Sequence, residues 1–436
     1  MSRFPIYKWS ELPEETKLKL LKRSELDVSK IQEAAADIIE DVKAKGDASI
    51  TEFLSKQVGR TVKPDELRVS EAGIAAAYKA LDPKVLRAMK HLIRNVTKFH
   101  KMQVPKSWEV EIEEGVFAGQ RVVPLDAAGV YCPSGKASYP SVSAMVTIPP
   151  KVVGVPRIAL ASPPAGEDMK MDPATLVASH LAGGDEFYIM GGAHAIAAFA
   201  YGTKTVKRVD VVAGPGGPWI QSSKRMVRDV VRTDLPAGPS EGMVLADGTI
   251  PAKYVAWNTL GEAEHGPDSA GVCVTISNKY AKEVAKEIDA ALDVLPEPRL
   301  HYVLENIKKY SCVVVCASME EAVDFVNAYA PEHVTIDSKN ARAIYKKYYN
   351  RIRHFGTLCL NTPISAGNFG IGPNSTLPTG GFARLYSGLS VDAFLKKPTV
   401  EEVRGKGWDR IKDMVIDMAE YEGFPSHAEA FRVRLE

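Results

Sequence analysis

One predicted helix end brings a carboxylate and an imidazole onto the same face. The sequence there is GEAEHGPDS over residues 261–269, and Gly266-Pro267 stops the helical period that precedes it. Glu262 and His265 stand three residues apart, so both side chains can reach one ion or one substrate. The same spacing also suits a histidine that caps its own helix beside a solvated glutamate, because a metal site needs further ligands from elsewhere in the chain.

A second pair of groups suited to proton transfer comes directly before a predicted strand. Glu332 and His333 are adjacent, and their ordinary pKa values lie on either side of neutral pH, where burial can tune both. Such a pair can divide two proton-transfer steps between a carboxylate and an imidazole. The alternative is a hydrogen-bonded loop histidine beside a surface glutamate.

Glycine-rich turns follow two of the predicted strands. They read GGAH over residues 191–194 and GPGG over residues 214–217, and open α/β sheets bind ligands at the carboxyl ends of their strands. Neither has the GxGxxG spacing of a dinucleotide-binding loop, so ordinary strand-to-helix turns are the alternative. The turn LPAGPSE at 235–241 could orient the Ser240 hydroxyl. His427, in the C-terminal tail, is by itself typical of a surface residue.

The elements that must position these groups alternate between strand and helix. Short Val/Ile runs punctuated by Gly and Pro predict strands near residues 157–162, 186–190, 209–213, 272–276, 312–316, 333–336 and 356–360. Helical spacing lies between most of them, which predicts parallel sheets with right-handed crossovers. The sequence therefore predicts two α/β lobes, at 121–236 and 237–385.

The two flanking segments have helical patterns. Residues 1–120 are predicted to form a helical N-terminal segment, with a change to Val/Ile runs from about residue 108. Residues 386–436 are predicted to form a helical C-terminal tail without a compact core. Such a tail needs another surface to pack on, either in the same subunit or in a partner.

Composition narrows the class of protein. The 436 residues include 55 basic and 54 acidic ones, and this balance argues against a nucleic-acid or membrane-surface partner, so a small-molecule substrate is expected. The N-terminus lacks the apolar core of a signal peptide, and no run reaches the roughly 18 apolar residues of a membrane span. Five scattered cysteines lack zinc or redox spacing. These features predict a soluble cytoplasmic protein.

Six segments together resemble the histidinol dehydrogenase family. In order they are PLDAAGVYCP at 124–133, GGAHAIAA at 191–198, GPG at 214–216, PAGPSE at 236–241, AEHGPDS at 263–269 and PEH at 331–333. The resemblance extends from about residue 20 to residue 435, and by these ordered matches the chain is identified as a member of the family.

The resemblance implies an α/β fold with two incomplete Rossmann-like parallel-sheet lobes, the first on the NAD side and the second on the zinc and catalytic side. It also implies a homodimer whose subunits exchange their terminal segments. Each site would hold one zinc ion, and NAD would accept hydride in two successive oxidations of a primary alcohol, through an aldehyde to a carboxylate.

Residue roles follow from the resemblance position by position. The implied zinc ligands are Glu262, His265, Asn368 and His427, the last from the other subunit. His333 is the implied general base, and Glu332 would activate water in the second oxidation. The implied cofactor contacts are Tyr131, His194 and Gly217. The implied substrate contacts are Ser141, Ser240, Glu262, His265, Ile364, Asn368, Ser375, Glu422 and His427.

The chain departs from the family at several of these positions. The family has Gln at Glu262 and Asp at Asn368, so the two changes keep one carboxylate and predict a rearranged metal site rather than a lost one. The family has Gln at His194 and Asn at Gly217, which leaves cofactor preference open between NAD and NADP. It has Glu at Ile364 and His at Ser375, groups that hold the substrate's ammonium and imidazole.

The predicted function is a zinc-dependent, NAD-linked alcohol dehydrogenase with L-histidinol as the default substrate. The alternative is a paralogue that acts on another small polar alcohol, as the family's sulfopropanediol dehydrogenases do. Arg384 and the pair Lys396-Lys397 could favour an anionic group. A second alternative, from a different class, is a non-catalytic protein that binds a small molecule.

Overall fold

A computed structural model describes residues 2–23, 29–135, 137–166 and 168–435. The chain divides into two compact units. Unit 1 contains residues 1–103 and 126–394, and unit 2 contains residues 104–125 and 395–436. Among the described residues, no helix is both long and apolar enough to cross a membrane.

Unit 1 contains two parallel sheets, each the centre of one lobe. The sheet of lobe 1 has the strand order β7-β6-β5-β8-β9. Its strands are β5 (Ala127–Tyr131), β6 (Arg157–Ser162), β7 (Glu186–Ile189), β8 (Val211–Ala213) and β9 (Arg232–Thr233). All four pairings are parallel. In chain order the strands therefore lie as 3-2-1-4-5, which is the Rossmann arrangement without its sixth strand.

Helices from two parts of the chain cover this sheet. The crossover helices are α6 (Pro140–Val153), α7 (Pro173–Ala182), α8 (Gly192–Tyr201) and α9 (Pro218–Met226). The N-terminal helices α2 (Ser29–Lys45), α3 (Asp47–Val58), α4 (Glu71–Ala80) and α5 (Pro83–Gln103) follow α1 in the chain. Helix α2 packs on α8 and α9, α4 packs on α7, and α5 packs on α6. The N-terminal helical segment thus completes lobe 1.

The sheet of lobe 2 repeats the same order. Its order is β1-β12-β11-β10-β13-β14, so β10 to β14 again lie as 3-2-1-4-5, and β1 is added at the edge beside β12. The strands are β1 (Ile6–Lys8), β10 (Glu241–Ala246), β11 (Ala270–Thr275), β12 (Cys312–Val315), β13 (His333–Asp337) and β14 (Thr357–Leu360). Two lobes with one topology confirm the predicted α/β class with incomplete Rossmann-like sheets.

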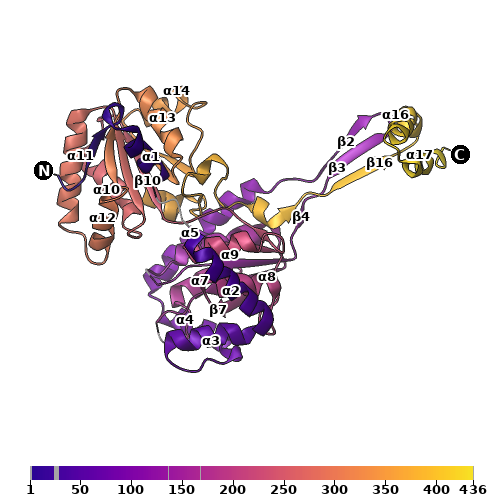
Figure 1. Ribbon diagram of the computed structural model, residues 1–436, viewed down its shortest axis with the longest axis horizontal. Helices are drawn as coiled ribbons and strands as arrows, with labels where there is room; N and C mark the ends of the chain where they lie inside the picture. The colour runs from indigo at the N-terminus through magenta and orange to yellow at the C-terminus, as the bar shows by residue number, and fades with distance from the viewer. Residues whose placement is uncertain (1, 24–28, 136, 167, 436) are drawn as a thin grey trace. The chain divides into compact units, whose positions relative to one another are not determined.

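Both faces of the lobe 2 sheet are buried, as expected for parallel strands. Val244, Cys273 and Val313 pack with α10 (Ala252–Ala263), α11 (Asn278–Leu292) and α12 (Arg299–Ile307) on one face. Residues Met243, Val272 and Val314 pack with α1 (Glu14–Lys22), α13 (Met319–Tyr329) and α14 (Ala341–Lys347) on the other. Figure 1 shows these two helical layers on either side of β10. Successive side chains along each strand therefore pack into two different hydrophobic cores.

Unit 2 is a small α+β body. The strands β2 (Trp108–Glu113), β3 (Val116–Gln120) and β16 (Thr399–Val403) form an antiparallel sheet in the order β16-β3-β2. The strands β4 (Val123–Pro124) and β15 (Leu395–Lys396) form a second antiparallel pair. Two helices, α16 (Gly407–Tyr421) and α17 (Pro425–Arg432), pack on each other.

The helical assignment of the two flanking segments is wrong in three places. Residues 6–8 form β1, which pairs with β12. Residues 108–120, included in the helical segment, form β2 and β3, and α5 ends at Gln103, close to the change to Val/Ile runs predicted near residue 108. Residues 399–403 form β16 within the tail. The strands β1, β3 and β16 pair with segments remote in the chain, and β2 adds to β3 as a hairpin, so strand pairing outweighs local helical propensity here.

Candidate functional site

Most of the predicted site residues of unit 1 line a cavity of about 760 Å³. Lobe 1 contributes the carboxyl ends of its strands, with Pro133 and Ser134 after β5 and residues 215–218 after β8. Strand order reverses between β5 and β8, which is where Rossmann-like sheets bind nucleotides. Lobe 2 contributes the amino edge of its sheet, through Ser240 before β10 and His333 at the start of β13.

Helix α10 places Glu262 at this edge. The helix returns from the carboxyl end of β10 to the amino end, so its last turn lies against the cavity, and Glu262 is only 2% exposed. The Oε2 atom of Glu262 lies 3.6 Å from Nε2 of His265, whose side chain is 37% exposed toward the cavity. Glu262 also packs closely on Gly242 in β10, where a Cβ would lie 3.1 Å from the Glu262 side chain.

The turn between α13 and β13 places Glu332 and His333. Ala330 has a φ of 50°, a left-handed conformation that ends α13 and directs the chain into the sheet. His333 is then the first residue of β13 and pairs in register with Gly242. Both Glu332 and His333 are buried, with 6% and 2% of their surface exposed.

Asn368 joins the two halves of the site. Its Nδ2 group donates a hydrogen bond of 2.7 Å to Oε1 of Glu262, and its Oδ1 lies 2.9 Å from Nε2 of His333. The other ring nitrogen, Nδ1 of His333, lies 3.5 Å from Oε2 of Glu332 and 3.3 Å from the backbone carbonyl of Glu241. The imidazole is therefore held from both sides.

Burial and charge together set the protonation of this cluster. Burial opposes the charged imidazole, but the carboxylates of Glu262 and Glu332 outweigh it and raise the pKa of His333 to about 10. Burial also opposes ionisation of Glu262, yet His333, His265 and the Asn368 amide hold its pKa below the usual value. For Glu332 burial prevails, and its pKa lies above the usual value. The imidazolium is thus the cation that balances these carboxylates.

The donor set suits a divalent cation such as zinc. Ligand atoms of Glu262, Glu332 and His333 all lie within 4.8 Å of one another. His265 supplies a second imidazole and Asn368 an amide oxygen at the same place. Carboxylate oxygen and imidazole nitrogen are ligands that zinc accepts. Of the four residues predicted as zinc ligands, the structure brings together Glu262, His265 and Asn368.

His427 and Glu422 belong to unit 2. His427 lies on α17 and Glu422 caps the end of α16, and both side chains are exposed. Their assignment to the site stays a prediction. Lys396 and Lys397, named above for an anionic group, are also residues of unit 2.

The predicted cofactor residues occupy different environments. Gly217 lines the cavity, and a side chain at that position would meet nothing within 4 Å. Tyr131, at the end of β5, is buried, and the Gly192 backbone N–H donates a hydrogen bond to its hydroxyl. His194 is 6% exposed and its ring stacks on Phe53 with centroids 4.3 Å apart. Of the three, only Gly217 is a lining residue of the described cavity.

The predicted substrate residues also differ in whether they line the cavity. Ser141, Ser240 and Ser375 line the cavity together with Glu332 and His333. Ile364 lies one layer behind it, 1% exposed and adjacent to Gly242. The backbone N–H of Ile364 donates to the side chain of Asn258, which fixes this layer.

Sequence reasoning missed two residues near the site. Among the described residues that line the cavity, Arg299 is the one arginine or lysine, and its Nη1 donates to the backbone carbonyl of Glu264. Glu241 was quoted in a motif without a role, yet it is fully buried at the start of β10. A glutamate that opens a strand of apolar residues needs a buried partner, and this was the available signal.

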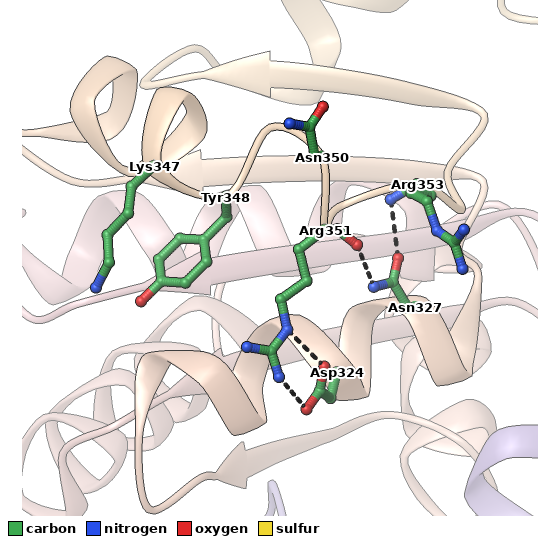
Figure 2. A pocket seen from close by; sticks show the side chains of 7 residues that line it. All are labelled: Asp324, Asn327, Lys347, Tyr348, Asn350, Arg351 and Arg353. Carbon is green, nitrogen blue, oxygen red and sulfur yellow. Dashed lines mark hydrogen bonds and ion pairs between the residues drawn. The ribbon is translucent and has the colours of Figure 1, made fainter.

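Two further hollows lie outside the cavity. One, of about 530 Å³, lies beside α13 and the segment after α14 (Figure 2). Several of its polar groups are paired with one another: Arg351 with Asp324 at 2.6 Å, and Asn327 with the backbone of residues 351 and 353. The other, of about 550 Å³, includes Arg384, whose guanidinium donates to the carbonyl of Ala328. Arg384 is thus not among the residues that line the main cavity.

The burial of His194 predicts a pH-dependent loss of stability. Burial lowers the pKa of this imidazole to about 4 from an ordinary 6.5, although Asp41 opposes the shift. As the pH falls from above 6.5 toward 4, His194 therefore takes up a proton in the unfolded chain but not in the folded one, and this difference favours unfolding. Lowering the pH from 8 to 5 should cost about 2 kcal/mol through this residue.

Urea unfolding of the wild type and of His194→Gln at both pH values measures this cost. The glutamine variant should lose less stability than the wild type by that amount, because all other titrating groups are shared. Equal losses in the two proteins would show that His194 is not buried as an uncharged group.

Known proteins place the chain in one family. The histidinol dehydrogenase family matches residues 21–435. A histidinol dehydrogenase from Methanothermobacter thermautotrophicus is 41% identical over 95% of this chain and 96% of its own length. A histidinol dehydrogenase homolog from Rhizobium meliloti is 39% identical over 98% of this chain and 94% of its own. The crystal structure of histidinol dehydrogenase from Elizabethkingia anophelis superposes with a TM-score of 0.92 at 31% identity, covering 100% of this chain and 98% of that one. The chain belongs to the histidinol dehydrogenase family.

Proposed function

We propose that this protein is a zinc-dependent, NAD-linked dehydrogenase that oxidises a small primary alcohol through an aldehyde to a carboxylate. L-histidinol is the default substrate because relatives at about 40% identity carry the name histidinol dehydrogenase. The observation that carries the proposal is the buried pair Glu332 and His333. Both line one cavity with the metal-ligand types Glu262 and His265.

In the first oxidation, His333 removes the hydroxyl proton while the carbinol carbon loses hydride. His333 needs its uncharged form to do so, and two carboxylates favour its charged form. Zinc held by Glu262, His265 and Asn368 would polarise the hydroxyl and, by neutralising Glu262, would lower the pKa of His333. The carboxylate of Glu332 then keeps the imidazole oriented for each turnover.

In the second oxidation, water adds to the aldehyde and a second hydride leaves. NAD, bound at the cavity, would supply the acceptor for the hydride of each oxidation. Glu332 is the group suited to accept the proton of the water, because burial raises the pKa of its carboxyl. Its Oε2 is held by the backbone N–H of Glu241 at 2.9 Å. The net result is one carboxylate and two reduced cofactors per alcohol.

Replacement of the two residues should separate the two oxidations. His333→Ala should slow both by roughly 10²–10⁴-fold, because each needs a general base. Glu332→Gln should slow aldehyde oxidation more than alcohol oxidation. NADH formation from the alcohol and, separately, from the aldehyde measures the two rates. Equal losses of both rates in Glu332→Gln would remove the water-activating role.

Zinc should bind in a fixed ratio to the protein. Purified protein is expected to contain about one zinc ion per subunit, and chelation should abolish turnover. His265→Ala should lose zinc, whereas His301→Ala, on the exposed surface of α12, should keep it. Elemental analysis of the three proteins provides the readout. A wild type that is free of divalent metal and unaffected by chelator would remove zinc from the proposal.

A different small polar alcohol, such as a sulfopropanediol-like diol, is the second candidate substrate. Ser375 leaves the cavity wall without the family's imidazole, and Ile364, one layer behind that wall, stands where the family has an acid. A charge-assisted hydrogen bond to an ammonium is worth about 1.5–3 kcal/mol, so histidinol should bind about ten- to a hundredfold more weakly. Arg299, on the cavity wall, favours a substrate whose far end is uncharged or acidic.

Restoring the family residues tests this preference. The double variant Ile364→Glu with Ser375→His should raise kcat/KM for histidinol about tenfold or more at the expense of the native substrate. Ile364→Gln with Ser375→His is the matched control that adds bulk without the anion. Efficient oxidation of histidinol by the wild type, with micromolar KM, would contradict the altered pocket.

The second alternative is a non-catalytic binding protein. It predicts that alcohols bind to the zinc-loaded protein without forming NADH. Calorimetry and absorbance on the same samples distinguish the two functions. The burial and mutual contacts of Glu332 and His333 favour catalysis, because a binding protein has no need of two buried proton-transfer groups.

We also propose a homodimer with exchanged terminal segments. Unit 2 has apolar side chains in regular arrays on its surface: Trp108, Val110 and Ile112 alternate along β2, and Met414, Met418 and Tyr421 follow helical spacing on α16. All six are exposed, Trp108 at 52% and Tyr421 at 90%. Apolar arrays of this kind favour burial against a second copy of the chain.

Complementation between inactive subunits tests the exchange. If His427 completes the partner's site, mixing His427→Ala with His333→Ala subunits should restore about a quarter of wild-type activity, because half of randomly paired dimers are mixed and each has one intact site. Light scattering verifies the dimer, and mass spectrometry of differently tagged subunits verifies the exchange. Exchange without recovery would mean that His427 acts within its own subunit or not at all.

A further inference from the structure

Arg23 is a buried cation that contacts the turn carrying Glu332 and His333 and the glutamate that opens β10. It follows α1, and its side chain is 1% exposed. Its Nη1 donates to the carbonyl of Tyr329 at 2.6 Å, and its Nη2 donates to that of Ala330 at 3.3 Å. Its guanidinium also stacks on the Tyr329 ring at 3.7 Å. These carbonyls end α13, two and three residues before Glu332 and only slightly further from His333.

The other side of the guanidinium holds Glu241. Nε of Arg23 lies 2.8 Å from Oε1 of Glu241, and Nη2 lies 2.5 Å from Oε2. The same Oε1 accepts a hydrogen bond of 2.8 Å from the backbone N–H of Gly380. The Glu241 side chain is fully buried. A two-pronged ion pair of this type fixes orientation as well as distance.

The backbone of Glu241 in turn holds the catalytic groups. Its N–H donates a hydrogen bond of 2.9 Å to Oε2 of Glu332. Its carbonyl lies 3.3 Å from Nδ1 of His333. One guanidinium therefore fixes the turn that carries Glu332 and His333 and the strand that orients their polar atoms.

We propose that Arg23 is a positioning residue for Glu332 and His333. It is not among the residues that line the cavity, and it acts through Glu241 and the end of α13. This inference rests on the proposed dehydrogenase function for its kinetic consequence only. The reacting imidazole needs placement to within a fraction of an ångström, because a displacement of about 1 Å can cost on the order of 10²-fold in rate.

The substitution Arg23→Lys separates a positioning role from a contribution to overall stability. Arg23→Lys keeps the positive charge beside Glu241, but the three donors on its single nitrogen cannot replace the two bonds to Glu241 together with those to the carbonyls of Tyr329 and Ala330. Arg157→Lys is the matched control. Arg157 pairs with Glu186 at 3.1 Å and donates to the carbonyls of residues 207 and 208 in lobe 1, away from the cavity. The two variants lose the same kinds of contact.

Kinetics on the zinc-loaded enzyme give the first readout. Arg23→Lys should lower kcat for the alcohol about 10- to 100-fold while KM changes less than about threefold. Arg157→Lys should leave both constants within about twofold at a similar loss of melting temperature. Equal kinetic effects in the two variants, or a kcat of Arg23→Lys near that of the wild type, would overturn the proposal.

Hydrogen exchange gives a second readout that does not depend on turnover. In Arg23→Lys, amide exchange should accelerate in peptides covering residues 238–242 and 329–335, and in Arg157→Lys it should not. If no alcohol is oxidised by the wild type, this pattern still decides the positioning role. If both peptides of Arg23→Lys exchanged as slowly as those of the wild type, the positioning role would be refuted even where the dehydrogenase function holds. Should Arg23→Lys fail to fold, Glu241→Gln removes the same ion pair, and the same kinetic and exchange criteria apply to it.

Discussion

Two buried carboxylates around one imidazole are the constraint on which the site depends. Glu262 and Glu332 are both nearly inaccessible, and His333 lies between them. Burying two like charges together costs several kcal/mol per ion unless positive charge is buried with them. An imidazolium meets that need in the isolated chain, and a divalent cation would meet it in a working enzyme. Gly242, Asn368 and the backbone of Glu241 then serve to hold these groups at contact distance.

The connection between the lobes extends this arrangement to the nucleotide side. The segment from Asp234 to Glu241 leaves β9 and enters β10, and much of it lines the cavity. At its start, Asp234 forms a buried ion pair with Lys224, and it also accepts the Gly214 N–H at 2.8 Å. At its end, Glu241 pairs with Arg23. One short segment, anchored by a buried ion pair at each end, therefore sets the turn after β8 relative to the catalytic pair.

The sequence predicted the parts of the site that depend on local spacing. Glu262 and His265 were paired because three residues make most of one helical turn, and the structure places them 3.6 Å apart. Seven strands of the two lobes were predicted because buried parallel strands read as continuous apolar runs, but β5 and β10, the central strands of the two sheets, were not. The order of strands within each sheet came from the resemblance rather than from spacing.

The parts that escaped prediction depend on contacts remote in the chain. Arg23 and Glu241 are 218 residues apart, and neither has a local pattern that names its partner. Strand β1 has three residues and exists through its pairing with β12. Ile364 was expected at the substrate, but a three-residue helix and the Asn258 hydrogen bond hold it behind Gly242.

The most direct measurement of the central claim is the stoichiometry of NADH formed per alcohol consumed by zinc-loaded protein. Small primary alcohols, including L-histidinol and an acidic diol, are supplied in limiting amounts. At least one of them should yield two NADH and one carboxylate per molecule, and His333→Ala should yield none on the same time scale. Binding of these alcohols without any NADH, or formation of one NADH with the aldehyde as final product, would contradict the central claim.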